Sequence, residues 1–316
     1  MKTKYLAVLA LPFLSLFFIG CPGNNPSSPG EPTSTPTITG TPTNTATSTP
    51  NVTPVGSNGT AYLEALSYTN SHLYGCDYTG NLYRFTDSGS SISIDYQTAM
   101  PSGYYASLAT TIASGNVTLF IDDSSNNVIR VYRDTGSAFA PVTSFGSGTY
   151  FAPRGIGLDG SGNVFVSDNN NGDNRIVPYS YDFSTNVATA GTPVTTTGIG
   201  LRGPGSIEFD GANTLYVCGN NSLATAKIYS FSDPSLSAGV SFGGSGGLSG
   251  GSDQVAVDPV SGKIFVIDSS DIKKFDTSGN LLFSFTTSSS GLGLAFDGAG
   301  HLYIGCVAGL IKIDTP

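Results

Sequence analysis

The sequence is poor in charged residues and in the residues that most often perform catalysis or hold metals. Its 316 residues include no Trp, 2 His and 13 Lys or Arg; 11% are charged, and the formal net charge is -9. So few basic residues cannot form the stripe that neutralises nucleic-acid phosphates. Two histidines are too few for the usual imidazole metal cluster. These shortages exclude nucleic acid as a partner and leave carboxylates as the main candidates for chemistry.

The acidic residues themselves are unevenly distributed between the two types. Glutamate occurs only as Glu31, Glu64 and Glu208, and all other acidic residues are aspartates. Aspartate is a turn residue, because its short carboxylate accepts hydrogen bonds from nearby backbone N–H groups. The acidity therefore favours turn chemistry over a cation trap.

Residues 1–20 have the pattern of a secretion signal. Lys2 and Lys4 precede an apolar run from residue 5 to residue 19, which is shorter than the ~20 residues that a membrane-spanning helix needs. The run ends in Phe18-Ile19-Gly20-Cys21, which resembles the lipobox of bacterial lipoproteins, although Phe18 stands where Leu is usual.

That resemblance implies cleavage before Cys21, lipidation of its thiol, and anchoring on the outer side of the bacterial cell envelope. Pro22 is not the Asp-type signal for retention at the inner membrane, so the outer membrane or the cell surface is favoured. Ordinary secretion with a free Cys21 is the alternative.

Residues 21–55 have a different composition, rich in Thr, Pro and Ser, with a single charge at Glu31 and no aromatic residue. Such a segment has no apolar face to bury, so we expect a disordered stalk behind the anchor. A Pro-rich ligand for a groove-binding partner is the alternative.

From residue 56 to residue 316 one strand motif recurs six times. It consists of Leu or Ile followed three residues later by an aromatic or apolar residue, as in Leu82-x-x-Phe85, Ile129-x-x-Tyr132, Ile176-x-x-Tyr179, Ile228-x-x-Phe231, Ile272-x-x-Phe275 and Leu310-x-x-Ile313. Each copy follows a strongly apolar run such as 164–166 or 302–304 and, in the later copies, a first run with small residues such as 156–158. Copies at roughly 40–50 residues predict an all-β, six-bladed β-propeller.

The sixth copy lacks an outer strand, because the chain stops at Pro316. An open sheet edge exposes unpaired backbone groups and promotes aggregation. We therefore expect the stretch after the stalk, around residues 52–63, to supply the missing strand and close the ring.

The third repeat carries the clearest motif. It contains Pro153-Arg-Gly-Ile-Gly-Leu-Asp159, Gly162-Asn163, a strand ending at Asp168, and Asn174-Arg175-Ile176. This pattern resembles the NHL-repeat family; the match is partial in repeats four to six and weak in the first two. The absence of Trp disfavours WD-repeat propellers.

Two sets of polar residues recur at equivalent positions. His72 and His301 each precede a Leu-Tyr pair, which favours packing at turns over a catalytic role. Second strands end at Asp77, Asp123, Asp168 and Asp268. We expect these aspartates to bind the backbone of the next turn, with a shared central cation site as the alternative.

Glu208 is the most unusual acidic residue, since it lies between Ile207 and Phe209 on a first strand. A partly buried carboxylate needs a partner, and Arg202 or Arg154 is the natural candidate. A general acid or base is the alternative.

After Cys21 three cysteines remain, Cys76, Cys218 and Cys306. Cys76 and Cys306 lie on second strands of neighbouring repeats, but packed sheets are ~10 Å apart while disulfide Cα atoms lie within ~7 Å. Buried thiols are therefore favoured over a bridge.

Two functions remain open. The first is a non-catalytic binding module for an envelope or extracellular protein, peptide or glycan, with no cofactor, whose loop aromatics Tyr104, Tyr105, Tyr150 and Phe151 are candidate contacts. The second is a lactonase or lyase, which the propeller resemblance implies would hold a divalent cation in its channel. Glu208 clustered with two or more Asp or Asn side chains would favour this enzyme, whereas a dry, Gly-lined channel would favour recognition.

Overall fold

The computed structural model describes most of the chain from residue 52 onwards. The described residues are 52–53, 62–148, 152–169, 174–219, 227–232, 236, 239–243, 248, 252–287, 291–307 and 309–314. The predicted signal peptide, Cys21 and nearly all of the predicted stalk lie outside them. No helix in the described part of the chain is long and apolar enough to cross a membrane.

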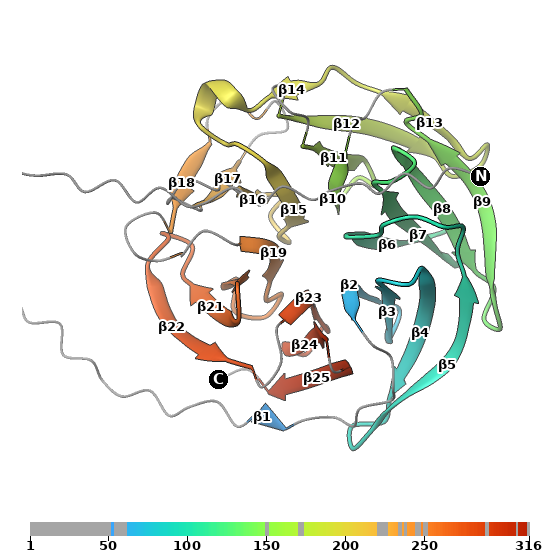
Figure 1. Cartoon of the computed structure of the whole chain (residues 1–316), viewed down its shortest axis with the longest axis horizontal. Coiled ribbons are helices and arrows are strands. Elements are labelled where there is room, and N and C mark those ends of the chain that lie inside the picture. Colours follow the sequence, from blue (N-terminus) through green and yellow to red (C-terminus); the bar gives the residue numbers. More distant parts are fainter. Residues whose placement is uncertain are drawn as a thin grey trace, which may run out of the picture. The chain divides into compact units, whose positions relative to one another are not determined.

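Six antiparallel sheets are arranged in a ring, as Figure 1 shows, and each sheet is one blade. This confirms the predicted six-bladed propeller. The inner strands of successive blades lie side by side around the whole ring.

Each blade runs from an inner to an outer strand. Blade 1 has β2 (Leu63–Thr69), β3 (His72–Asp77), β4 (Asn81–Asp87) and β5 (Ile92–Ala99). Blade 2 has β6 (Leu108–Ala113), β7 (Asn116–Asp123), β8 (Val128–Asp134) and β9 (Phe139–Phe145). Blade 3 has β10 (Pro153–Leu158), β11 (Val164–Asp168), β12 (Arg175–Asp182), β13 (Val187–Ala190) and the short β14 (Val194–Thr195) beside β12, followed by the 3-10 helix η1 (Thr197–Ile199).

The second half of the ring repeats this order. Blade 4 has β15 (Pro204–Phe209), β16 (Leu215–Gly219), β17 (Lys227–Phe231) and β18 (Val240–Phe242). Blade 5 has β19 (Ser252–Val257), β20 (Ile264–Asp268), β21 (Asp271–Phe275) and β22 (Leu281–Thr286). Blade 6 has β23 (Gly291–Phe296), β24 (His301–Cys306), β25 (Gly309–Asp314) and the distant β1 (Val52–Thr53).

The ring closes as the sequence predicts. Val52 pairs with Ile313 and Thr53 with Lys312 in antiparallel register, so β1 covers the outer edge of β25. The closing strand therefore lies ahead of residue 56, where the sequence analysis placed the start of the propeller.

Six buried hydrophobic clusters form the core, and each lies between two neighbouring blades. The second strands contribute most to them, and β11, β16 and β20 are buried along their whole length. Small residues on the inner strands let the blades approach: a Cβ on Gly155 would lie 2.0 Å from the carbonyl oxygen of Gly205 in the next blade. The packing explains why the second strands are apolar on both faces.

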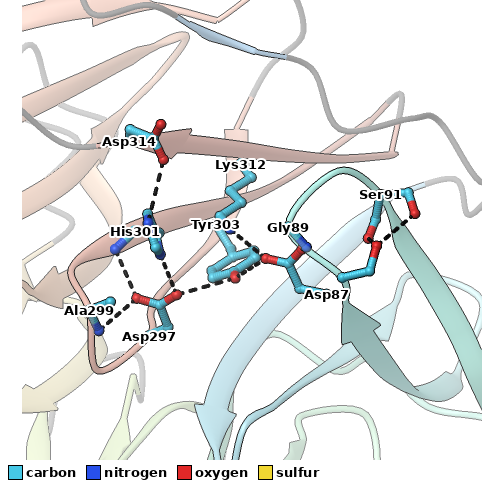
Figure 2. A network of polar contacts seen from close by, with 10 residues as sticks. Asp87, Gly89, Ser91, Asp297, Ala299, His301, Tyr303, Lys312 and Asp314 are labelled. Carbon is cyan, nitrogen blue, oxygen red and sulfur yellow. Dashed lines mark hydrogen bonds and ion pairs between the residues drawn. The ribbon is translucent and has the colours of Figure 1, made fainter.

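A polar network joins blade 6 to blade 1 (Figure 2). Asp87 accepts hydrogen bonds from the Tyr303 hydroxyl and the Lys312 ammonium, both at 2.6 Å. The backbone N–H of Gly89 donates to the same carboxylate at 2.7 Å. The contacts tie the last blade to the first.

A similar network joins blade 1 to blade 2. Asp134 accepts from the Tyr74 hydroxyl at 2.6 Å, from Arg84 at 3.2 Å and also from the Tyr96 hydroxyl. Tyr74 and Tyr303 follow His72 and His301 at the same spacing, so one sequence repeat builds both networks.

Candidate functional site

A cavity lies in the central channel, at the end where the inner strands finish. It has a volume of about 420 Å³ and all six blades line it. Its lining is apolar or aromatic in part, as at Leu108, Ile156 and Phe209, and it contains the carboxylates of Glu208, Asp210 and Asp258. A cavity of this size and composition suits a small ligand.

Glu208 differs from the other acidic residues of this cavity because its carboxyl has no partner within the described residues. It lies near the end of β15, opposite Tyr216 on β16, and its side chain is partly exposed to the cavity. Within the described residues its carboxylate has no hydrogen bond and no ion pair. Burial alone raises the pKa of Glu208 to about 8, because a low-dielectric environment disfavours the charged form.

The expected pairing of Glu208 with Arg154 or Arg202 is wrong for the described structure. Arg154 lines a different cavity, where its guanidinium lies 5.9 Å from the centre of the Tyr104 ring. Arg202 is exposed. Adjacency in sequence is misleading here because Arg154 lies at the start of β10 and Arg202 lies just before β15, whereas Glu208 lies towards the end of β15.

The two other carboxylates of the cavity are committed to turns. Asp210 accepts from the backbone N–H groups of Ala212 and Thr214 at 2.9 and 2.7 Å. Asp258 accepts from the N–H of Val260 at 2.9 Å and from the Ser261 hydroxyl at 2.5 Å. Glu208 thus shares its cavity with two aspartates, the arrangement expected of an enzyme, but both hold backbone loops.

The donor set therefore does not fit the divalent cation that the lactonase resemblance implies. A calcium ion takes 6–8 oxygen ligands at ~2.3–2.6 Å. Among the residues that the structure describes, no three His, Cys, Asp or Glu side chains are grouped so as to hold a metal.

A smaller cavity of about 80 Å³ opens where the inner strands begin. Glu64, Tyr104, Arg154, Asn169 and Gln254 are among the residues that line it. In the sequence Glu64 stands out only because glutamate is rare, and Gln254 belongs to no motif.

Gln254 crosses the channel. Its side-chain amide on β19 of blade 5 donates to the carbonyl oxygen of Ala106, just before blade 2, at 2.9 Å. The two blades are opposite each other in the ring. Both residues line the small cavity and neither lines the large one, so the bond crosses the channel at the small cavity.

Asp122 is a second buried carboxyl that the sequence did not reveal. Burial raises its pKa to about 7, opposed by hydrogen bonds from the N–H groups of Ser107 and Ala106 at 2.7 and 2.8 Å. It therefore holds the segment that carries the Gln254 acceptor. Its sequence signal was weak, because Asp123 occupies the repeated strand-end position beside it.

The four aromatic candidates have different positions. Tyr104 is partly exposed at the small cavity and packs edge-on against Tyr78, with ring centres 6.2 Å apart. Tyr105 is fully buried, and its hydroxyl donates to the carbonyl oxygen of Pro101. This placement makes Tyr105 a packing residue rather than a surface contact. Tyr150 and Phe151 lie outside the described residues.

The strand-end aspartates do not meet in the channel. Each is buried and is held within its own blade: Asp77 accepts from the Tyr83 hydroxyl at 2.6 Å, Asp123 from Arg130, Asp168 from Arg175, and Asp268 from the Lys273 ammonium at 2.5 Å. Backbone N–H groups also donate to three of them, at Asn81, Asn126 and Ala152. Their contacts match the turn role, extended by pairing with the third strand of the same blade.

The histidines and cysteines occupy structural positions. His301 contacts Asp297 at 2.6 Å and His72 contacts the carbonyl oxygen of Asn70 at 2.7 Å, both at hairpin turns. Cys76, Cys218 and Cys306 are free and buried, which confirms the expectation of thiols.

Comparison with known proteins finds the fold but no family. No family model matches the chain, and no curated protein matches it. A streptogramin B lyase structure is 10% identical, with a TM-score of 0.54 over 80% of this chain and 93% of that one.

Two lactonase structures are also similar. A putative gluconolactonase is 15% identical, with a TM-score of 0.61 over 84% of this chain and 91% of the other. A gluconolactonase from Xanthomonas campestris is also 15% identical, with a TM-score of 0.60 over 81% and 86% of the two chains. Such low identities show a shared six-bladed fold and nothing finer, so the NHL-repeat resemblance stays a prediction.

Proposed function

We propose that this chain is a non-catalytic binding module, held on the outer side of the bacterial cell envelope by lipid at Cys21, whose propeller takes a small ligand or the end of a larger partner into its central cavity. The observation that supports it is Glu208, an unpaired carboxyl in a cavity of about 420 Å³ lined by all six blades. Natural folds give their buried polar groups hydrogen-bond partners, so a carboxyl without one, in a cavity that raises its pKa, points to a ligand.

The remaining polar groups of the cavity favour binding over turnover. Hydrolysis by paired carboxylates needs a second group free to exchange a proton with substrate or water. Asp210 and Asp258 already accept hydrogen bonds from their own turns. A single unpaired carboxyl can orient a ligand without a second group.

A blocked cavity tests this proposal. Gly211 lines the cavity, and a Cβ there would meet no atom within 4 Å, so Gly211→Trp can be placed without backbone strain. Gly298 occupies the equivalent turn of blade 6 with equally open surroundings but does not line the cavity, so Gly298→Trp is the matched control.

Ligand-observed NMR on the full chain, with a mixture of small amines, sugars and carboxylates, gives the readout. We expect at least one class to bind the wild type and Gly298→Trp but not Gly211→Trp. No binding by any class, or equal binding by all three proteins, would contradict a ligand cavity.

A lactonase or lyase is the second candidate, favoured by the raised pKa of Glu208. With its pKa near 8, the carboxyl would carry a proton at neutral pH and could act as a general acid. Hydrolysis of gluconolactone by the wild type, with and without added calcium or magnesium, and its loss in Glu208→Gln would support this enzyme.

The anchor has its own test. Cys21→Ser removes the thiol that would carry the lipid, so the protein should move from the membrane fraction to the soluble periplasmic or secreted fraction. A wild type that is already soluble would remove the anchor from the proposal and leave the cavity unaffected.

A further inference from the structure

The charges around the central cavity are of one sign. Among the described residues, Glu208, Asp210 and Asp258 line it, and no Lys, Arg or His does. Asp258 interacts electrostatically with Lys274, which does not line the cavity. A ligand that enters meets acceptor oxygens and, within the described residues, a Glu208 carboxyl that has no basic partner.

The cavity also offers aromatic surface that is already held in place. The Tyr68 ring stacks on Tyr303 with centres 5.8 Å apart. Phe209 and Phe296 each pack against the phenylalanine of a neighbouring blade, Phe165 and Phe265, with centres 5.0 Å apart. Rings fixed in this way give contact area at little entropic cost, and aromatic faces attract cations.

We infer that the cavity takes a small organic cation whose charged nitrogen pairs with Glu208 and whose carbon body packs on the aromatic and aliphatic wall. This inference rests on the proposed function and names the chemical class of its ligand. A nitrogen cation needs one close carboxylate, whereas a hard metal ion needs several oxygens around a point. The separation of the three carboxylates meets the first need and fails the second.

Proton exchange gives the pairing a distinct signature. Because the pKa of Glu208 is raised to about 8 by burial, most molecules carry a proton there at neutral pH. A bound cation favours the ionised carboxylate, so binding at about pH 7 releases a proton. Asp210, Asp258 and Tyr68 also face the cavity, but none of them contributes to the shift at Glu208, which burial alone causes.

Three probes of similar shape and different charge distinguish recognition of the ligand's charge from recognition of its shape. 2-Phenylethylamine, 2-phenylethanol and phenylacetate are titrated calorimetrically into the full chain near neutral pH, in two buffers of different ionisation enthalpy. We expect the amine to bind at least about tenfold more tightly than the alcohol and to release up to one proton, while the acid binds most weakly.

Variants then assign the charge effect to one residue. Glu208→Gln should weaken amine binding about tenfold or more, abolish the proton release and leave alcohol binding unchanged. Glu64→Gln makes the same chemical change in the small cavity and should leave all three affinities as in the wild type. Thermal melting of both variants checks that they are folded.

The alternative outcomes separate the inference from the function on which it rests. Equal binding of amine and alcohol, lost in Gly211→Trp, would overturn the cation and keep the binding cavity. Calcium or magnesium binding that is lost in Glu208→Gln would overturn it in favour of a metal. No binding by the probes or by the NMR mixture would overturn both proposals.

Discussion

The carboxylates at the seams between blades have hydrogen-bond partners, whereas the carboxyl of Glu208 in the channel has none within the described residues. Asp87 and Asp134 each accept two or more side-chain hydrogen bonds across a seam, from tyrosine and from lysine or arginine. Despite burial, these bonds hold the pKa of both aspartates below its usual value. Glu208 has no such partner in the described structure, and its pKa is raised to about 8.

This difference separates a structural role from a functional one. A carboxylate whose hydrogen bonds are all supplied by the protein stabilises the fold and has little left to offer a ligand. A carboxylate that is desolvated without compensation destabilises the fold until a ligand supplies the missing charge. The repeat builds the first kind, and Glu208 in blade 4 is of the second.

The strongest test of the comparison is to break a seam. Asp134→Ala removes the acceptor shared by Tyr74, Tyr96 and Arg84, and we expect the free energy of unfolding to fall by about 3–5 kcal/mol. Urea denaturation measures it. Asp182→Ala, which removes an exposed turn carboxylate, is the control and should have a far smaller effect. A comparable loss would show that the seam contributes no more to the free energy of unfolding than an exposed turn does.

Glu208→Gln should change stability in the opposite direction, and only above about pH 4.5. The folded pKa of about 8 is above the ordinary value of 4.5, so the unfolded chain ionises first as the pH rises. The wild type therefore loses stability between these two values and pays the full cost above pH 8, on the order of a few kcal/mol. Below about pH 4.5 the two proteins should unfold alike.

Chemical denaturation across this pH range checks the result. A wild type that is more stable than Glu208→Gln at high pH would mean that the carboxylate has a partner, and would weaken both proposals.

The closing strand β1 pairs with the outer edge of blade 6. Blades 6 and 1 therefore have this backbone pairing in addition to the contacts of Asp87. A chain that begins at residue 47 keeps β1, whereas one that begins at residue 56 loses the pairs Val52–Ile313 and Thr53–Lys312. We expect the shorter chain to be less stable by about 1–2 kcal/mol and to self-associate through the open edge of β25. Thermal melting and light scattering measure the two effects, and identical behaviour would show that β1 is dispensable.

Gln254→Ala should have the smallest effect on stability, about 1 kcal/mol, because it removes one hydrogen bond. It also removes the bond that crosses the channel at the small cavity, so we expect a ligand of the central cavity to dissociate faster. Stopped-flow or relaxation measurements compare the rates, with Gln97→Ala on β5 as a control far from the channel end of its sheet. Equal dissociation rates would show that the Gln254–Ala106 hydrogen bond does not control ligand release.

The repeat was readable because each blade uses the same local rules. Ile or Leu three residues before an aromatic or apolar residue marked every third strand, and apolar runs such as 164–166 marked the second strands, since these strands are buried on both faces. The need for a closing strand followed from counting strands, and β1 supplies it. These features depend on local pattern and on burial, which a sequence records directly.

The site was only partly predictable. Glu208 stood out in the sequence by its unusual place on an inner strand. That its carboxyl has no partner within the described residues depends on which end of the channel each arginine occupies. Gln254 has no motif, because its partner is a backbone carbonyl 148 positions away on the opposite blade. The sequence by itself determined the blades, their order and the closure, because these follow from local periodicity. Only the tertiary structure decided which carboxylates are paired, because pairing depends on residues brought together across the ring.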